Sequence, residues 1–269
     1  MRARPLRVLV GGGRGFIGAR AVQALGAAGH DVGVLEVGDD VGAIGASGWD
    51  VLVWAAGARR ATVDDNRAEH VTAAVTAVRA CAGLRRAVYL SSGECYGAQD
   101  PPFREDAPLH GDSPYARAKI EGERAIAAAI DAVVLRPAVV YGRGQGGAMF
   151  VPSIVAALRA GQRFAMTAGE QTRDLIHVDD VAAAIVAAIA GPAGAYNVAS
   201  GVEHTLLALA AQIAARIGPD AAALLDVGAL PYRDGEQMRY VLDPTRASVA
   251  LGWRAVIPLT TGLDELIAS

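Results

Sequence analysis

Short, uninterrupted runs of aliphatic residues alternate with alanine-rich stretches through the first half of the chain. The runs LRVLVG, HDVGVLEV, DVLVWAAG, RAVYLSS and DAVVLRPAVVYG lack the strict apolar–polar alternation of a sheet with one wet face. Continuous runs of this kind are typical of strands that are buried on both faces of a parallel sheet. Because helical stretches such as SPYARAKIEGERAIAAAI separate them, we expect an α/β fold with a doubly wound parallel sheet.

The second half of the chain is less regular from about Gly144 onward. Prolines separate short elements there, namely Pro152, Pro192, Pro219, Pro231, Pro244 and Pro258. We therefore expect residues 1–143 to form the α/β domain. Residues 144–269 should form mostly a small lobe over the carboxyl edge of its sheet, with about 172–200 returning to the first domain. Ligands of such folds bind outside the carboxyl ends of the strands, so the lobe is the expected substrate-binding part.

The composition argues against several classes of partner. The chain has 269 residues, a formal net charge of −3 and no run of Lys and Arg, so nucleic acid is not an expected partner. No stretch of about 20 uncharged apolar residues predicts a membrane span. Cys81 and Cys95 are too few for a disulfide framework, which favours a reducing cytoplasm. We expect a cytoplasmic protein without a bound metal, and its first residues predict a strand rather than a signal peptide.

The segment VLVGGGRGFIGARAV passes from a predicted strand into a predicted helix, with Gly12, Gly15 and Gly18 spaced as GxxGxxG. Glycines let the backbone turn tightly and approach a pyrophosphate, to which the helix N-terminus presents N–H groups and the positive end of its dipole. A chain with 32 glycines also produces such spacings by chance, so a plain strand–helix turn is the alternative. The position between strand and helix favours a dinucleotide-binding turn.

Two charged residues near this turn bear on the choice of dinucleotide. Glu36 ends the second predicted strand, 18 residues after Gly18. A carboxylate there can accept hydrogen bonds from a ribose 2′-hydroxyl and would repel a 2′-phosphate, which favours NAD. Arg14 indicates the opposite preference if its guanidinium binds a 2′-phosphate, or else is a solvated side chain on the rim of the turn. We expect NAD, with NADP left open.

Tyr115 and Lys119 lie four positions apart, on one face of a predicted helix. The phenol titrates near pH 10 and is a poor base alone, but a neighbouring ammonium favours its phenolate form. Such a tyrosine can exchange a proton with a hydroxyl or carbonyl while hydride moves to or from a nicotinamide. Ser91 and Ser92, at the end of a predicted strand, could hydrogen-bond the reacting oxygen. An ordinary solvated helix face is the alternative.

Eight short segments follow one another along the chain: GGGRGFIG, DVLVWAAG, VYLSSGECYG, YARAK, LRPAVVYG, TRDLIHVDDVA, YNVASG and LDPTRASVALGW. In this order they resemble the extended short-chain dehydrogenases/reductases called NAD-dependent epimerases/dehydratases, over nearly the whole length. The resemblance implies a Rossmann-like fold with Ser92, Tyr115 and Lys119 as the catalytic residues, Ser92 being identified by counting back from Tyr96 and Gly97. It also implies a cofactor site made by Gly12, Arg14, Gly15, Phe16, Ile17, Gly18, Glu36, Ala55, Ala56, Tyr115 and Lys119.

The resemblance also indicates how the substrate is bound. Glu94 stands where dehydratases and decarboxylases of the family carry a glutamate, as a substrate contact or a rim residue. The aspartate that dehydratases carry just before it is Gly93 here, which argues against elimination of water. Arg173 and Arg233 match two arginines that bind the diphosphate of a nucleotide sugar, for which paired guanidinium groups are well suited.

The same residues have structural alternatives. Arg173 could instead pair with Asp174 or Asp179, and Arg233 could be structural. We interpret His177 as structural, and we expect Asp179 and Asp180 to cap the helix that follows.

Three departures from the family pattern stand out. Only 14 positions separate Glu36 from Asp50, too few for the full strand and helix that the family places there. Asp39 or Asp40 could replace the lost adenine contact, or be loop residues, which we favour. Val139 stands where an asparagine is common near the substrate phosphates. Asn66 lies near the position of the usual helix asparagine but does not align with it cleanly.

Taken with the resemblance, these residues predict an NAD(P)-dependent enzyme acting on a nucleotide-activated sugar by 4-epimerisation or 4-keto reduction. A reductase or dehydrogenase of a non-nucleotide secondary alcohol or ketone is the alternative, and a non-catalytic dinucleotide-binding protein is the third. The resemblance also implies a homodimer formed through helices flanking Tyr115.

Overall fold

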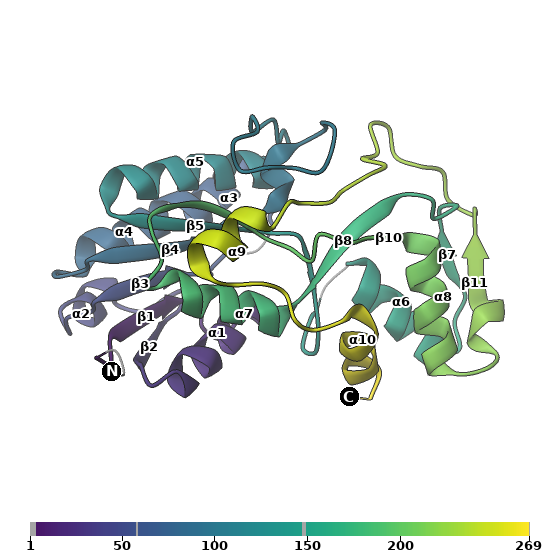
Figure 1. Ribbon diagram of the computed structural model, residues 1–269, viewed down its shortest axis with the longest axis horizontal. Coiled ribbons are helices and arrows are strands. Elements are labelled where there is room, and N and C mark those ends of the chain that lie inside the picture. The colour runs from purple at the N-terminus through teal and green to yellow at the C-terminus, as the bar shows by residue number, and fades with distance from the viewer. Residues whose placement is uncertain (1–3, 58, 147–148, 269) are drawn as a thin grey trace.

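The computed structural model describes residues 4–57, 59–146 and 149–268 (Figure 1). Its largest element is a parallel sheet of six strands in the order β2-β1-β3-β4-β5-β9. This confirms the predicted α/β fold with a parallel sheet. The strands are β1 (Arg7–Gly11), β2 (Asp31–Leu35), β3 (Val51–Trp54), β4 (Arg86–Leu90), β5 (Ala132–Pro137) and β9 (Gly194–Val198).

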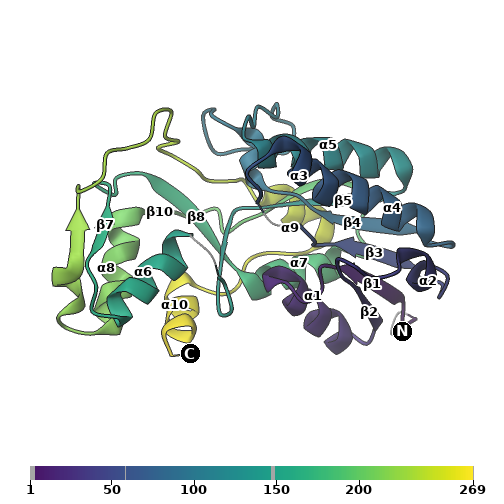
Figure 2. The ribbon, with the colours of Figure 1, turned by 180° about the vertical axis from the view of Figure 1, so that it is seen from behind.

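Helices cover both faces of this sheet (Figures 1 and 2). On β1, Val8 and Val10 face a core shared with one helix layer, whereas Leu9 between them faces the core of the other layer. Both faces are therefore dry, which explains the unbroken apolar runs. One layer comprises α1 (Phe16–Ala27), α7 (Val178–Ala188) and α9 (Thr245–Leu251), and the other comprises α2 (Val41–Gly45), α4 (Ala73–Ala80) and α5 (Pro114–Ala129).

The sheet ends at β2, and the short segment that follows it forms no further strand. Asp39 accepts a hydrogen bond from the Glu36 backbone N–H at 2.7 Å, and Asp40 caps α2 by accepting from Ala43 N at 3.0 Å. Both aspartates are thus turn and cap residues. Trp49 then packs its ring over β2, where a side chain at Gly33 would overlap it. The missing strand is replaced by one five-residue helix and one indole ring.

A continuous helical stretch follows β3 and contains a wide turn. It consists of α3 (Val63–Arg67), a π-helical turn η1 (Ala68–Thr72) and α4. Insertions of this kind occur often at functional sites, because the extra residue changes which side chains face inward. His70, in the middle of η1, is fully buried.

Most of the elements that follow β5 in the chain form a separate lobe at one end of the molecule (Figures 1 and 2). Its core contains side chains such as Ile154, Leu175 and Ile213. Strand β8 runs antiparallel to β10 and parallel to β6, while β7 and β11 form a parallel pair. The remaining elements of the chain, most of them in this lobe, are β6 (Val139–Tyr141), α6 (Phe150–Arg159), β7 (Phe164–Met166), β8 (Thr172–His177), β10 (Glu203–Thr205), α8 (Leu206–Ile217), η3 (Ala221–Leu224), β11 (Leu225–Val227), α10 (Leu259–Ile267) and, after β4, η2 (Gly93–Tyr96).

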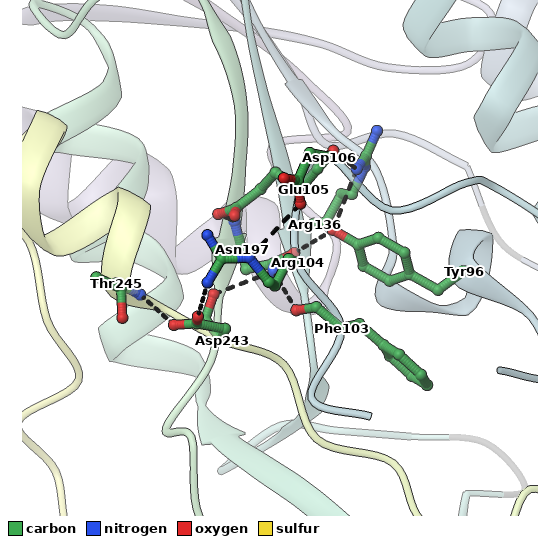
Figure 3. Close-up of polar contacts among 9 residues, drawn as sticks. All are labelled: Tyr96, Phe103, Arg104, Glu105, Asp106, Arg136, Asn197, Asp243 and Thr245. Atoms are coloured by element: carbon green, nitrogen blue, oxygen red, sulfur yellow. Dashed lines mark hydrogen bonds and ion pairs between the residues drawn. The ribbon is translucent and has the colours of Figure 1, made fainter. Parts of the chain in front are cut away.

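A polar network centred on Asn197 fastens two loops to the outer strand β9 (Figure 3). The Asn197 side chain donates to the Phe103 carbonyl at 2.9 Å and the Asp243 carbonyl at 3.1 Å, and accepts from the Tyr96 hydroxyl at 2.7 Å. Its backbone N–H donates to the Glu105 carboxylate at 2.8 Å. The loops thereby cover a sheet edge that would otherwise present unpaired backbone groups.

Among the described residues, no helix is both long and apolar enough to cross a bilayer.

Helix α7 is capped differently from the prediction. His177, not Asp179 or Asp180, is its N-cap residue, and Nδ1 of His177 accepts from the Asp179 backbone N–H at 3.3 Å. The expected aspartate cap is therefore wrong. The Asp180 carboxylate is buried and accepts from the backbone N–H groups of Val256 at 3.1 Å and Ile257 at 3.0 Å. His177 and Asp180 thus fix the entry of α7 and the segment leading into α10.

Candidate active site

The glycine turn follows β1, at the point of the sheet where the strand order changes direction, with β2 on one side of β1 and β3 on the other. Gly12 has φ of +73°, and a Cβ there would stand 2.5 Å from the Ala56 Cα. A Cβ on Gly18 would overlap the Gly12 carbonyl, so helix and turn could not approach this closely with other residues. Helix α1 starts at Phe16, after an N-cap glycine whose lack of a side chain leaves the first turn open. The turn therefore has the shape and the donors that a pyrophosphate requires.

Glu36 lies at the rim of the same turn. Its carboxylate accepts the backbone N–H of Arg14 at 2.7 Å, while the Arg14 side chain is exposed. A carboxylate next to the glycine turn and at the end of β2 is placed to accept hydrogen bonds from an adenosine ribose. The described residues therefore fit a dinucleotide, and the Glu36 carboxylate lies at the rim of the turn that would hold it.

Three side chains meet at the start of α5, beyond the ends of β4 and β5. The Lys119 Nζ is buried, donates to the Leu90 carbonyl at 2.7 Å and lies 5.7 Å from the centre of the Tyr115 ring. The Ser92 side chain lies close enough to Tyr115 to lower the pKa of its phenol, and its hydroxyl accepts from the Glu94 backbone N–H at 3.1 Å. The structure therefore brings together Ser92, Tyr115 and Lys119, the three residues predicted to be catalytic.

Local sequence explains why α5 presents Tyr115 there. Ser113 is the N-cap, accepting from Ala116 N at 3.0 Å, and Pro114 follows in the first turn. Both residue types are favoured at these positions, so the helix starts at Pro114, one residue before the tyrosine.

Ser91 is excluded from the reaction by its own partners. It is 2% exposed and donates to the Glu123 carboxylate at 2.5 Å. Arg136 binds the same carboxylate through two hydrogen bonds of 2.9 and 2.7 Å, and also donates to the Tyr96 hydroxyl at 3.1 Å. This buried network lies beneath the strand end that carries Ser92.

The electrostatic environment keeps the phenol protonated at rest. Burial raises the pKa of Tyr115 above its ordinary value, against the lowering effects of Arg59 and of the hydrogen bond from Ser92. Burial also lowers the pKa of Lys119 to about 8. At neutral pH the pair is therefore a neutral phenol beside an ammonium, which can donate a proton and stabilise the phenolate that remains.

His70 connects the tyrosine to the glycine turn, and the sequence did not single it out. Its ring meets that of Tyr115 edge-on, with centres 5.2 Å apart and planes at 83°. A side chain at Gly57 would overlap the His70 ring, and Gly57 follows Ala56, which packs on Gly12. The glycine turn and the Tyr115 phenol are thus joined by a short series of direct contacts along one edge of the sheet.

Arg59 and Glu94 form an ion pair over the tyrosine, which the sequence also did not predict. Both guanidinium Nη atoms donate to the Glu94 carboxylate, Nη1 at 3.0 Å. The Arg59 Cζ lies 4.7 Å from the centre of the Tyr115 ring, a cation–π distance. Ser113 donates to the same carboxylate at 2.6 Å. Glu94 is therefore already occupied by partners from two loops.

Tyr240 reaches the site from the lobe side of the chain. A Cβ on Gly93 would overlap the Tyr240 hydroxyl, and would also stand 2.9 Å from Leu242 Cδ2. The phenol thus fills the space that a larger residue at 93 would need. Gly93, which the resemblance places where dehydratases of the family carry an aspartate, is thus packed against the Tyr240 hydroxyl.

The family model of the NAD-dependent epimerases/dehydratases matches residues 8–199, which contain the glycine turn, Ser92, Tyr115 and Lys119. The chain belongs to the NAD-dependent epimerase/dehydratase family. The aligned part of this chain spans only about three fifths of the length of the first relatives found, 62% of a UDP-glucose 4-epimerase and 56% of a dTDP-glucose 4,6-dehydratase. The family is NAD-dependent, and solved structures of similar fold contain NAD or NADPH.

Individual relatives are similar over different lengths. A UDP-glucose 4-epimerase of Mycolicibacterium smegmatis is 37% identical over 201 residues, which cover 69% of this chain and 62% of that protein. A 3-diazoavenalumate denitrifying reductase of a Streptomyces species is 31% identical over 297 residues, covering 94% of this chain and 97% of that protein. The crystal structure of a Thermotoga maritima UDP-glucose 4-epimerase with UDP-glucose has a TM-score of 0.87 at 24% identity, with 98% of each chain covered, and shows the shared fold.

The two arginines expected to bind phosphate differ in their surroundings. Arg173, on β8, forms an ion pair with Glu236 and donates to the Gln237 carbonyl at 2.8 Å. It pairs with neither Asp174 nor Asp179. The Asp174 carboxylate is instead taken by the segment after β9, accepting from Ser200 Oγ at 2.6 Å. Arg233 is exposed, in the turn that leads to Glu236.

Asn66, which lies near the position of the usual helix asparagine of the family, hydrogen-bonds the loop after β3. Asn66 is fully buried, and its amide brackets the loop after β3 by donating to the carbonyls of Arg60 at 2.9 Å and Thr62 at 2.6 Å. It also accepts the Arg60 backbone N–H at 3.1 Å. Asn66 therefore fixes the loop that carries Arg59.

Proposed function

We propose that the protein transfers hydride and a proton at a hydroxyl-bearing carbon of a nucleotide-activated sugar, by 4-epimerisation or 4-keto reduction. The observation that carries the proposal is the convergence of Ser92 and Lys119 on the Tyr115 phenol at the edge of the sheet that holds the glycine turn. The similarity to a UDP-glucose 4-epimerase supports the substrate class.

Each residue then has a defined task. Tyr115 donates its proton to the substrate oxygen when a carbonyl is reduced and accepts it when a hydroxyl is oxidised. Ser92 hydrogen-bonds the same oxygen, and Lys119 holds the cofactor ribose and stabilises the phenolate. When bound, the nicotinamide supplies or accepts the hydride. Epimerisation further requires the keto form to turn over in the pocket before it is reduced again.

A second candidate is a reductase of a ketone or related group on a substrate without a nucleotide. Two observations favour it: the Arg173 guanidinium is already paired with Glu236, and a relative that covers 94% of the chain is named a 3-diazoavenalumate denitrifying reductase. Val139, in place of the asparagine near the substrate phosphates, agrees with this candidate.

Calorimetric titration of the NAD-loaded protein with UDP and with dTDP separates the two candidates. Micromolar binding that Arg173→Gln weakens at least tenfold, and that Arg216→Gln leaves unchanged, supports the nucleotide sugar. Arg216 is a matched control because it also pairs with a carboxylate, that of Asp264, on the lobe. No heat with either nucleotide supports the second candidate.

A separate measurement tests catalysis itself. Tyr115→Phe should reduce turnover by roughly 100-fold or more while leaving NAD binding intact, because the phenol supplies the proton transfer. The assay follows NADH fluorescence with UDP-4-keto sugars and with aromatic ketones. Because epimerisation leaves no net NADH, turnover of UDP-glucose is followed by chromatography of its C4 epimer. Unchanged turnover in Tyr115→Phe would contradict the mechanism for either substrate.

We further propose that Glu36 makes the protein prefer NAD to NADP. We also propose that the protein forms a homodimer through the helices that flank Tyr115. Light scattering coupled to size-exclusion chromatography tests the dimer: a mass near 28 kDa would refute it, since the chain has a mass of 27.6 kDa.

A further inference from the structure

Arg59 lies against the catalytic phenol, and the reaction proposed above gives it no task. Its guanidinium carbon is 4.7 Å from the centre of the Tyr115 ring, closer than the Lys119 ammonium at 5.7 Å. Two cations therefore face a single phenol, one from α5 and one from the loop after β3.

The position of Arg59 is held from both sides. The buried Asn66 amide clamps the backbone of the next residue, Arg60, through the hydrogen bonds described above. The Glu94 carboxylate receives both Nη groups of the guanidinium and is itself fixed by Ser113. A side chain that only projected into water would have neither support. The arrangement places a planar cation on the ring face in a defined orientation.

The two members of the ion pair act on the phenol in opposite directions. The positive charge of Arg59 lowers the pKa of Tyr115, and the negative charge of Glu94 raises it, while burial raises it most. Arg59 has the larger of the two opposed effects, since its guanidinium lies directly on the ring. The groups around the phenol are Lys119 from α5, Arg59 from the loop after β3, His70 from η1, Tyr89 from β4, and Ser92, Glu94 and Cys95 from the segment after β4.

We propose that Arg59 is a positioning residue of the active site, which holds positive charge over the Tyr115 ring and, with Lys119, stabilises its phenolate form. Glu94 is the tether that orients the guanidinium and offsets part of its charge. This inference rests on the proposed role of Tyr115 as acid and base, and it gives Glu94 a task other than substrate contact.

A fluorine label tests the proposal without a substrate. Difluorotyrosine is placed at position 115 alone, because its more acidic phenol titrates where the protein is stable, and its ¹⁹F signal is followed against pH. Four proteins are compared, namely the labelled parent and its Arg59→Gln, Arg59→Lys and Glu94→Gln variants. Arg163→Gln is the matched control: Arg163 also forks onto a carboxylate, that of Asp226, at similar exposure, but on the lobe.

The expected shifts have opposite signs. For a charge 4.7 Å from the ring centre, Coulomb's law with the dielectric constant of water gives about 0.6 pH units, so Arg59→Gln should raise the midpoint by roughly that amount. Glu94→Gln should lower it, and Arg59→Lys should restore most of the parent value. Midpoints within about 0.2 units of the parent for both Gln variants, or shifts of the same sign, would overturn the proposal.

Failure of this inference is distinguishable from failure of the proposed function. If Tyr115→Phe retains turnover while the fluorine midpoint responds to Arg59, the catalytic assignment is wrong and the electrostatic contact stands. If turnover is lost in Tyr115→Phe but the midpoint does not respond, Arg59 has no role as a positioning residue.

Discussion

The buried ion pair between Glu123 and Arg136 offers the sharpest test of how the site is supported. Both side chains are under 10% exposed, and two hydrogen bonds of 2.9 and 2.7 Å join them. Ser91 donates a third hydrogen bond to the same carboxylate, directly beneath the strand end that presents Ser92. Replacing Glu123 by Ala removes the acceptor of all three bonds and leaves the guanidinium buried without its partner.

The magnitude follows from that loss. Removing one partner of a buried pair destabilises a protein by about 3–5 kcal/mol, because the remaining charge is uncompensated. Arg136 keeps its hydrogen bond to the Tyr96 hydroxyl, so we expect the lower half of that range, about 3–4 kcal/mol. For a domain of this size the melting temperature should fall by roughly 6–16 °C. The double variant Glu123→Leu, Arg136→Met removes both charges together and should be close to the parent in stability.

Urea denaturation followed by circular dichroism measures these differences. The control is Arg67→Gln, which breaks an exposed pair with Glu121 and should change the free energy of unfolding by less than about 1 kcal/mol. A Glu123→Ala variant no less stable than Arg67→Gln, or a double variant as unstable as Glu123→Ala, would refute the reasoning.

Three further outcomes follow from the same geometry. Gly93→Ala should lower the free energy of unfolding by about 1–3 kcal/mol, measured by thermal denaturation, because the added methyl group overlaps the Tyr240 hydroxyl. Adding Tyr240→Phe to the same chain should recover part of this loss. Equal losses with and without the Tyr240 hydroxyl would contradict the overlap. Burial lowers the pKa of Lys119 to about 8, below its unfolded value of about 10.5, so between these pH values the unfolded chain binds a proton that the folded chain has released. The free energy of unfolding of the parent should therefore rise between pH 8 and pH 10 relative to that of Lys119→Met, as measured by urea denaturation. The same pH dependence in both proteins would show that the pKa of Lys119 is not lowered in the folded chain. Glu36→Gln removes the carboxylate at the rim of the glycine turn. It should improve the affinity for NADP relative to that for NAD by roughly tenfold, measured by fluorescence titration of the reduced cofactors. An unchanged ratio of the two affinities would show that Glu36 does not set the preference for NAD.

Much of the fold and the central part of the site were predictable from the sequence, because they depend on local patterns. Unbroken apolar runs have to be buried on both faces, which leads to a parallel sheet with two helix layers. The glycine spacing and the Tyr115–Lys119 pair are also local, since one turn and one helix face place all their members. Ser92 could be chosen over Ser91 by its distance along the chain from Tyr96.

The residues that the sequence did not reveal depend on long-range packing. Arg59 lies in an irregular loop of arginines and alanines, and only the clamp of Asn66 and the position of Glu94 bring it over the phenol. His70 reaches Tyr115 because a π-helical turn, which has no clear sequence signal, shifts the side chains of that helix. Tyr240 is separated by 125 residues from the tyrosine whose site it borders.

The contact between Gly93 and Tyr240 also limits how this chain can diverge. The β-carbon of any residue larger than glycine at 93 would enter the volume already taken by the Tyr240 hydroxyl. Such a residue is accommodated only as far as the Tyr240 side chain turns away or is itself replaced by a smaller one. Substitutions at the end of the catalytic strand and in the segment that carries Tyr240 are therefore expected to be coupled as this chain diverges.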